Sequence, residues 1–533
     1  MIPCVIFEDD HLLVVNKPAG WNTHAPSPYA GEGIYDWLRH REPRWASLAI
    51  IHRLDKETSG VMVFGKTALA NRSLTEQFSS REVRKKYLLL TDRAPRQAAF
   101  TVRSKLTRAG ERYVSGPRGE IAETIFQIAN RQSAIGSQSK TPHVGGYKVI
   151  AEPLTGRTHQ IRVHAAEHGF PILGDTLYGG PPFQRVCLHA AEISFKHPAR
   201  NESVTFNAPV NFVMDARQTL RAAIVEREAT DSFRLIHGAS DGWPGWYVDR
   251  FGDVLLSQSE VELSEAQFHC LDEILNIKAV YHKFLNRQVQ RSESVQASPR
   301  LASGVPMPGR FEIRENGVKF EVGFGEGYSV GLFLDQRDNR RRLLTGHIAG
   351  DFSLRTRDSR PEILNTFAYT CGFSVCAALG GARTTSLDLS KRYLEWGKRN
   401  FTLNGLDPAE HDFIYGDAFD WLKRLGKKQR AFDVVVIDPP TFSQSKDGGV
   451  FRVEKDYGKL ITAALPVLKR GGVLFASTNA AGWPPEDFLG RVGDAIRKAD
   501  RKIVQQHYVP QPPDIPVSRA EPAYLKTVWL RVA

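Results

Sequence analysis

The first candidate for a reactive group in this sequence is a carboxylate that lies among charged and turn-forming residues. Asp55 lies in the segment HRLDKETSG, residues 52–60, directly before an apolar, strand-like run. Taken alone, an Asp followed by Thr-Ser-Gly indicates a turn. Two other segments change that interpretation: NKPAG at 16–20, and GRTHQIRVH at 156–164, which is followed by PILGD at 171–175. A carboxylate that stays ionised can act as a nucleophile without a metal or redox cofactor.

A second set of polar residues follows four apolar runs in the last third of the chain. The first run leads into FAYTCGF at 367–373, and the others lead to Asp388, Asp417 and DPPTF at 438–442. In open parallel sheets, ligands bind beyond the carboxyl ends of the strands. Asp388 lies 16 residues after Gly372, where its carboxylate can meet ribose hydroxyls. The turn lacks GxGxxG, which argues against a site for the pyrophosphate of a dinucleotide. Asp417 and the DPP motif favour S-adenosylmethionine as the ligand.

The elements that must position these groups divide the chain into three predicted domains. Residues 1–225 are β-rich with a few helices, 226–325 form a smaller mixed segment, and 326–533 alternate strands with helices. The four apolar runs of the last domain predict a parallel sheet with helices on both faces; they cover residues 362–367, 384–390, 411–418 and 432–440. The expected fold class is therefore α/β and α+β, multidomain.

Local patterns predict individual elements in the first two domains. We expect strands at 12–16, 60–66 and 86–91 and a helix at 68–80, whose apolar residues recur near one face. Residues 287–308, rich in Ser, Arg, Gln and Pro, are expected to form an exposed loop.

Composition restricts the class of protein. Of the 533 residues, 41% are hydrophobic and 24% are charged, which is typical of globular domains. No apolar run approaches the roughly 18 residues of a membrane helix, and no basic leader precedes the first apolar residues. The five cysteines form no CxxC pair, so we expect neither disulfides nor a metal site. These features predict a cytoplasmic protein.

Positive charge is concentrated in the first predicted domain. Residues 1–225 contain 29 Lys and Arg against 20 Asp and Glu, a net charge of +9. The remaining 42 and 39 residues of these types give 226–533 a net charge of only +3. A polyanionic partner is therefore expected mainly on the first domain.

The motifs NKPAG, HRLDKETSG and TGRTHQIRVHAAEHGFPILGD, in this order, resemble the RluA family of pseudouridine synthases over nearly all of residues 1–225. The resemblance implies a mixed β-sheet with helices, an RNA substrate and no cofactor. It implies that Asp55 is the nucleophile and that Tyr87 stacks on the target uracil. It also implies that Arg162 pairs with Asp55 and that Arg53 helps to expel the base from the RNA. A tyrosine packed in a strand core remains an alternative for Tyr87, and a plain phosphate contact remains one for Arg53.

The motifs DNRRRLLTG, NTFAYTCGFSVCAALGGA, LDLSKRYLEWGKRNFTLNGL and FDVVVIDPPTFSQSK resemble large-subunit rRNA methyltransferases of the RlmI and RlmK type. This resemblance covers residues 231–533 and implies a Rossmann-like, mainly parallel sheet that binds S-adenosylmethionine, preceded by a small domain. The cofactor residues it implies are Phe367, Tyr369, Gly372, Asp388 at the ribose, Asp417 at the adenine edge, and Asp438. The residues implied to face the target base are Pro439, Pro440, Phe442 and Asn479.

The cysteine positions bear on which atom is methylated. Methylating C5 of cytosine needs a cysteine thiolate to attack C6 first. Asn479 stands where RlmI-type enzymes carry that cysteine, and no cysteine follows Cys376. Asn479 and the run after DPP resemble the RlmK type, so we expect methylation of guanine, at N7 ahead of N2. Cys371, in the cofactor loop, is the alternative nucleophile.

Other interpretations remain open at this point. Asp417 could simply cap a helix, and Gln336 and Arg337 could approach the cofactor or cap a helix. One half could deliver RNA to a single catalytic half, and the RNA could be tRNA instead of rRNA. An NAD-dependent oxidoreductase would leave DPPTF unexplained. The sequence does not define the oligomeric state.

Overall fold

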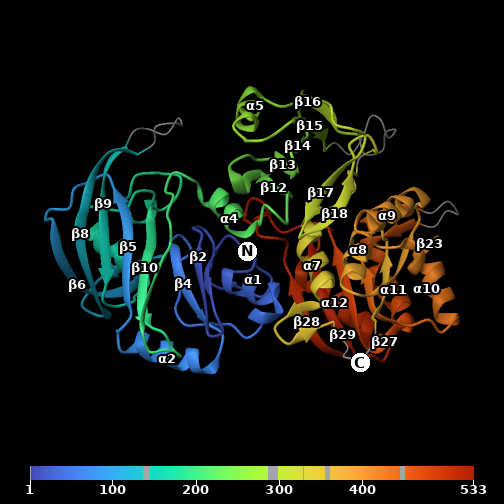
Figure 1. Ribbon diagram of the computed structural model, residues 1–533, viewed down its shortest axis with the longest axis horizontal. Coiled ribbons are helices and arrows are strands. Elements are labelled where there is room, and N and C mark those ends of the chain that lie inside the picture. The colour runs from blue at the N-terminus through green and yellow to red at the C-terminus, as the bar shows by residue number, and fades with distance from the viewer. Residues whose placement is uncertain (1, 136–143, 286–297, 328, 355–359, 445–449) are drawn as a thin grey trace. The chain divides into compact units, whose positions relative to one another are not determined.

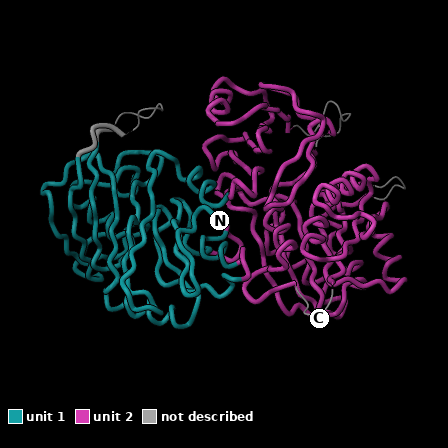
Figure 2. Tube along the Cα trace, viewed as in Figure 1, with its two compact units in different colours: residues 1–26, 32–39, 44–225 teal, residues 27–31, 40–43, 226–533 magenta. Residues whose placement is uncertain are grey.

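The computed structural model describes residues 2–135, 144–285, 298–327, 329–354, 360–444 and 450–533. These residues form two compact units (Figure 2). Unit 1 comprises residues 1–26, 32–39 and 44–225, and unit 2 comprises 27–31, 40–43 and 226–533. The predicted second and third domains therefore both belong to unit 2.

A sheet of 11 described strands forms the body of unit 1 (Figure 1). Its main path is β1-β2-β4-β10-β5-β9-β8-β6-β7, with β3 beside β4 and β11 beside β10. The strands are β1 (Val5–Glu8), β2 (Leu12–Lys17), β3 (Ala49–Ile50), β4 (Ser59–Gly65), β5 (Arg84–Thr91), β6 (Ala99–Ala109), β7 (Arg112–Ser115), β8 (Glu120–Ile135), β9 (Val144–Pro153), β10 (Leu188–Lys196) and β11 (Ser203–Asn207). Most neighbours are antiparallel, and β4 with β10 is a parallel pair.

The helices of unit 1 pack beside this sheet. They are α1 (Ile34–Arg41), α2 (Ala68–Ser79), α3 (Gln160–Glu167) and α4 (Ala216–Ile224). Thr67 caps α2, because its side chain accepts a hydrogen bond from the backbone N–H of Ala70. The strands predicted at 12–16, 60–66 and 86–91 and the helix at 68–80 are all confirmed.

The first part of unit 2 contains a small sheet in the order β12-β13-β14-β15-β16. Its elements, with the hairpin that follows, are β12 (Ser232–His237), β13 (Tyr247–Phe251), β14 (Val254–Ser259), α5 (Glu265–Asp272), β15 (Ala279–Phe284), β16 (Arg300–Gly304), β17 (Phe311–Glu315) and β18 (Val318–Val322). The prediction of a loop over 287–308 is wrong where β16 forms, because antiparallel pairing with β15 makes that segment a strand. Residues 286–297 of that expected loop lie outside the described part of the chain.

The remainder of unit 2 is built on a sheet in the order β23-β22-β21-β24-β27-β29-β28. The strands from β23 to β27 are mutually parallel, and β29 is antiparallel to both of its neighbours. They are β21 (Glu362–Thr366), β22 (Arg383–Asp388), β23 (Asp412–Tyr415), β24 (Phe432–Ile437), β27 (Leu468–Thr478), β28 (Ile503–Val509) and β29 (Lys526–Val532). All four predicted strands are present at the expected places.

Helices cover both faces of this sheet, as the alternating pattern predicts. They are α7 (Arg337–Thr345), α8 (Gly372–Leu379), α9 (Lys391–Leu403), α10 (Ala418–Lys427), α11 (Val453–Ala464) and α12 (Pro485–Lys498). Val434 and Val436 of β24 pack in one core with residues of α8 and α9. Val435 and Ile437 pack in a second core with residues of α10, α11 and α12. Because strand side chains alternate, a run that is apolar at every position must be covered on both sides.

Among the described residues, no helix combines the length and the apolar character that crossing a membrane would need.

Candidate active sites

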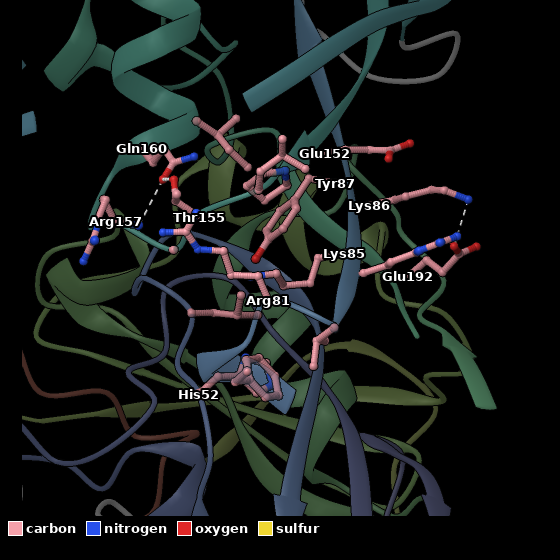
Figure 3. Close-up of a pocket in the computed structure, with 18 of the residues that line it drawn as sticks. His52, Arg81, Lys85, Lys86, Tyr87, Glu152, Thr155, Arg157, Gln160 and Glu192 are labelled. Carbon is pink, nitrogen blue, oxygen red and sulfur yellow. Dashed lines mark hydrogen bonds and ion pairs between the residues drawn. The ribbon is translucent and has the colours of Figure 1, made fainter. Parts of the chain in front are cut away.

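A cavity of about 1570 Å³ in unit 1 brings together residues from two of the three motifs of the first domain, HRLDKETSG and TGRTHQIRVH, and residues of β5. Asp55 and Arg53 line it from the loop before β4, and Arg162 lines it from α3. Tyr87 lines it from β5 (Figure 3). The four residues that the resemblance singles out therefore share one cavity, although they span more than 100 positions of the chain.

Strand β10 lies between β4 and β5 and decides how far the Asp55 loop is from Tyr87. At the start of β4, Gly60 has φ +123°, and a Cβ placed on it would lie 2.2 Å from the carbonyl oxygen of Ala190 in β10. Only glycine allows this approach. The Gly of HRLDKETSG is thus explained by contact between two backbones, where the sequence suggested a turn.

The loop that carries Asp55 is held by side chains from the N-terminal segment. Thr23 Oγ1 donates to the carbonyl oxygen of Leu54 at 2.9 Å, and Lys17 Nζ donates to that of Lys56 at 3.2 Å. Both contacts fix the backbone directly beside Asp55, whose own side chain is half-buried. The carboxylate is therefore positioned through its neighbours.

Lys17, from the motif NKPAG, has no solvent exposure. Its Nζ also donates to the carbonyl oxygens of Pro18 at 2.9 Å and Trp21 at 2.7 Å. Burial lowers the pKa of Lys17 to about 7, although the charges of Glu57 and Asp55 act to raise it. The sequence did not assign Lys17 a role; the only signal was a lysine that ends an otherwise apolar strand.

Tyr87 lies between small residues of the adjacent strands. Ala190 of β10 and Ala151 of β9 are its register partners, and its half-buried ring packs beside the core of unit 1. Burial and the charge of Asp55 raise the pKa of Tyr87. The side chain therefore offers a neutral aromatic ring to the cavity (Figure 3).

Arg162 makes its charge-assisted hydrogen bonds to Asp175, so the pairing with Asp55 expected from the resemblance is not what the described residues form. Nε and Nη2 donate to the two carboxylate oxygens of Asp175, both at 2.7 Å, and both side chains are buried. Burial lowers the pKa of Arg162, but Asp175 and, less strongly, Asp55 raise it above the ordinary value. The guanidinium is thus fixed by Asp175 and acts on Asp55 through its charge.

Two further residues complete the surroundings of Arg162. The Arg162 guanidinium lies 5.0 Å from the ring centroid of Tyr178. The Tyr178 hydroxyl accepts a hydrogen bond from the backbone N–H of Tyr113 and lies 2.8 Å from Nδ1 of His159. Burial and the charge of Arg162 lower the pKa of His159, so Arg162 keeps its charge beside a neutral imidazole. Arg53, by contrast, is exposed.

In unit 2, the turn after β21 has an unusual backbone. Phe367, Tyr369 and Cys371 all have positive φ, at 56°, 50° and 62°. This folding turns the backbone N–H of Tyr369 toward Asp388 at the end of β22, with a 2.8 Å hydrogen bond to Oδ2. Gly372 then begins α8, where an added Cβ would lie 3.3 Å from the side chain of Arg340.

Asp388 connects two loops at the carboxyl edge of the sheet. Its Oδ1 accepts a hydrogen bond from the backbone N–H of Ser390 at 2.8 Å, in addition to the bond from Tyr369. Burial raises the pKa of Asp388 although both hydrogen bonds act to lower it. Each carboxylate oxygen can accept a second hydrogen bond, as a ribose diol would require.

Asp417 caps α10. Its Oδ1 accepts hydrogen bonds from the backbone N–H groups of Phe419 at 2.9 Å and Asp420 at 3.2 Å. The capping alternative is therefore realised, and contact with an adenine edge remains a proposal.

Asp438, directly after β24, is held by neutral donors. Gln336 Nε2 donates to Asp438 Oδ2 at 3.2 Å and to Ser477 Oγ at 2.8 Å. Asn339 Nδ2 in turn donates to the side-chain oxygen Oε1 of Gln336 at 2.8 Å. Burial raises the pKa of Asp438 to about 6, although the hydrogen bond from Ser477 acts to lower it.

Gln336 and Arg337, which could either approach the cofactor or cap a helix, make different contacts. Gln336 makes no side-chain cap for α7 and instead contacts Asp438. Arg337 forms a buried ion pair with Asp514.

The residues expected to face the target base gather beside Asp438. β24 and β27 are parallel neighbours, with Ile437 opposite Ala476. Asn479 after β27 is exposed, as are Pro440 and the β25 (Phe442–Gln444) residue Phe442, whereas Pro439 is buried. Ser445 and Lys446 of the DPP run lie outside the described residues.

Cys371 is directed into the protein core. It has no solvent exposure, and a Cβ placed on Gly397 of α9 would lie 2.3 Å from its Sγ. Burial raises the pKa of Cys371 to about 12, and burial also raises that of Cys376. Neither thiol can supply a thiolate at neutral pH.

The resemblance implies that S-adenosylmethionine binds at the carboxyl edge of the unit 2 sheet. Hydrogen-bond acceptors that lack a donor there indicate whether this cofactor fits the residues present. Among the described residues, Asn365 Oδ1 and Asp335 Oδ1 are buried without a hydrogen-bond partner. Asn365 is in β21, and Asp335 precedes Gln336. Such atoms are normally satisfied, and a ligand that carries an ammonium, hydroxyls and a sulfonium supplies donors and positive charge. The residues fit this cofactor.

Comparison with known proteins gives two family matches. Residues 11–167 match the RNA pseudouridylate synthase family, and residues 271–531 match the S-adenosylmethionine-dependent methyltransferase family. Ribosomal RNA large subunit methyltransferase I of Klebsiella pneumoniae is 33% identical over 342 residues, which is 62% of this chain and 82% of that protein. Ribosomal RNA large subunit methyltransferase of Deinococcus radiodurans is 31% identical over 345 residues, 63% of this chain and 81% of that protein.

A solved structure, human RNA pseudouridylate synthase domain containing 1, aligns with a TM-score of 0.32 and 26% identity, covering 39% of this chain and 82% of that chain.

The ion pair of Arg162 predicts a large effect of the Asp175→Asn substitution. Because the change leaves a buried guanidinium without its anion, we expect the free energy of unfolding to fall by about 3–5 kcal/mol. Glu120→Gln is the matched control, because Glu120 pairs with Arg157 at an exposed position, where the loss should stay below about 1 kcal/mol. Urea unfolding of both variants checks this, and equal losses would contradict it.

The raised pKa of Asp438 predicts a pH-dependent stability. The folded protein holds a proton at Asp438 up to about pH 6, whereas the unfolded chain releases it near 3.8, so ionised Asp438 destabilises the fold above pH 6. Asp438→Asn should therefore be more stable than the wild type at pH 7.5, by up to about 3 kcal/mol. The gain should vanish near pH 4.

Urea unfolding at the two pH values measures this difference. Asp487→Asn, at an exposed position of α12, controls for the change in charge. A difference of the same size at both pH values would contradict the assignment.

Proposed function

We propose that this chain makes two different modifications in large-subunit rRNA. It belongs to the family of ribosomal RNA large subunit methyltransferases, and an RNA pseudouridylate synthase domain precedes its methyltransferase domain. Unit 1 isomerises uridine to pseudouridine, and unit 2 methylates a base, guanine at N7. The single observation that supports the proposal is that each unit brings together polar groups from separate motifs: Asp55, Tyr87 and Arg162 line one cavity, and Asp388, Asp417 and Asp438 lie at or just after the ends of strands of one sheet.

Forming pseudouridine requires a nucleophile that intervenes and then leaves. The Asp55 carboxylate bonds to C1′ of the ribose while the N1–C1′ bond breaks, and the detached uracil turns over. C5 then bonds to C1′, the carboxylate is released, and the proton of C5 leaves as N1 takes one up. No cofactor enters this balance. The fixed charge of Arg162 stabilises the anionic uracil that is detached when the N1–C1′ bond breaks.

The uracil is out of reach while it is stacked in RNA, so it must be flipped into the cavity. The neutral ring of Tyr87 gives it a face on which to stack. Exposed Arg53 offers a planar guanidinium that can take the place of the base or hold a phosphate.

Bound S-adenosylmethionine supplies a methyl group on a positively charged sulfur, and the residues of unit 2 position it and the target. Asp388 would accept hydrogen bonds from the ribose hydroxyls of the cofactor, Asp417 would lie beside its adenine, and the turn from Phe367 to Gly372 would line its site. Pro439, Pro440, Phe442 and Asn479 hold the target base.

The choice of guanine N7 rests on the cysteines. Both buried thiols near the cofactor turn have raised pKa values, so covalent activation of cytosine C5 lacks its nucleophile. Guanine N7 already has a lone pair, so positioning suffices. Methylation at N7 removes no proton and leaves the base positively charged, which Asp438 can stabilise as an anion above pH 6.

The RNA substrate is proposed from charge and from the relatives. The net charge of +9 on residues 1–225 suits a polyanion, and the relatives are named for the large ribosomal subunit. Such a substrate would put the enzyme in the cytoplasm.

Substituting Asp55→Asn should reduce pseudouridine formation to background and leave methylation unchanged, because the two sites use different residues. Both products are measured with the full-length protein on unmodified rRNA, and Glu57→Gln, two residues away, serves as the control. Pseudouridine formed by the Asp55 variant would refute its role. Loss of both products would mean that the two reactions are coupled.

The methylated nucleoside identifies the target atom. After reaction with labelled S-adenosylmethionine, we expect mass spectrometry to find 7-methylguanosine, and to find it equally with the Cys371→Ala variant. The appearance of 5-methylcytidine, lost on Cys371→Ala, would overturn both the atom and the role of Asn479.

A further inference from the structure

Lys85 is a cation in the cavity of unit 1 without an anionic partner among the described residues. It lines the cavity from β5, two residues before Tyr87, and its side chain is half-buried. Among the described residues, no carboxylate forms an ion pair with it, whereas the adjacent Lys86 pairs with Glu192 at 2.9 Å. Burying an unpaired ammonium costs free energy, so its retention in this cavity suggests a ligand.

The surroundings of Lys85 place its charge inside the cavity. Nζ lies 5.8 Å from the ring centroid of Phe78 in α2 and would lie 4.0 Å from a Cβ on Gly156, before α3. His52, stacked on Phe78 with ring centroids 4.7 Å apart, accepts a hydrogen bond from the backbone N–H of Val63 and is neutral. Burial lowers the pKa of Lys85, and no described carboxylate opposes this.

The spacing of Lys85 and Tyr87 suggests what the ligand is. Residues i and i+2 of a strand point to the same face about 7 Å apart, a separation comparable with that between the base and the phosphate of one nucleotide. We propose that Lys85 binds a backbone phosphate of the target nucleotide while Tyr87 stacks on its uracil. This inference rests on the proposed pseudouridine synthase activity.

Lys86 provides a matched control. It is the next residue on the same strand, it is exposed, and its charge is already paired with Glu192. Both lysines line the cavity, so Lys85→Met and Lys86→Met remove the same group from neighbouring positions of one strand, and only the Lys86 charge already has an ion-pair partner.

The experiment measures the affinity of full-length protein for an RNA that the wild type converts, over a range of salt concentrations. Lys85→Met should weaken binding at least about tenfold and reduce the log–log salt slope by about 0.7, the loss of one phosphate contact to single-stranded RNA. Lys86→Met should keep the wild-type slope. Lys85→Arg should restore most of it, because the charge is retained.

The outcomes separate this inference from the proposed function. Thermal melting shows that each variant is folded; if Lys85→Met is not, Lys85→Gln is measured in its place. If the log–log salt slope of RNA binding is unchanged when the Lys85 charge is lost, the phosphate contact is overturned. This holds also if kcat falls without a change of slope, because Lys85 would then act on the uracil. Pseudouridine formation by the wild type tests the synthase activity separately, so its absence would refute the proposed function.

Discussion

Several buried arginines beside these two sites are held by fixed carboxylate partners, and these ion pairs determine much of the local structure. In unit 2 the consecutive residues Arg337 to Arg342 of α7 are all buried. Arg337 pairs with Asp514, and Arg340 forms a bidentate pair with Glu315 of β17, with both distances 2.7 Å. These pairs hold the helix that begins directly after Gln336. In unit 1, the pair of Arg162 and Asp175 does the same for α3. Removing one partner of such a pair is costly, which makes both helices rigid supports.

The two sites hold their carboxylates in contrasting ways. Asp55 is half-buried near the Arg162 guanidinium and lines an open cavity, where its carboxylate can reach carbon. Asp438 is surrounded by the neutral donors Gln336 and Ser477, and burial outweighs them, so its charge is present only above about pH 6. A carboxylate of the first kind suits covalent chemistry, and one of the second kind suits recognition of a base that becomes positively charged.

Sequence patterns predicted the elements well and their long-range partners poorly. The apolar run of β24 required cover on both faces, and the motif order placed Asp55, Tyr87 and Arg162 together, because these features depend on local periodicity or on whole motifs. The partner of Arg162 was missed, since only the turn after α3 returns Asp175 to the guanidinium. Gln336 and Asp438 are 102 residues apart, and nothing local to either predicts their contact. The pairing of β16 likewise comes from β15 and not from its own polar sequence.

The central claim is that one chain carries two chemically independent sites, and release of tritium from C5 of uridine tests it most directly. Pseudouridine formation replaces the C5–H bond by a C–C bond, so each turnover of an rRNA transcript labelled at C5 releases one tritium. We expect equal release with and without S-adenosylmethionine, and methyl incorporation only when the cofactor is present. Absence of tritium release, or release that requires S-adenosylmethionine, would contradict it.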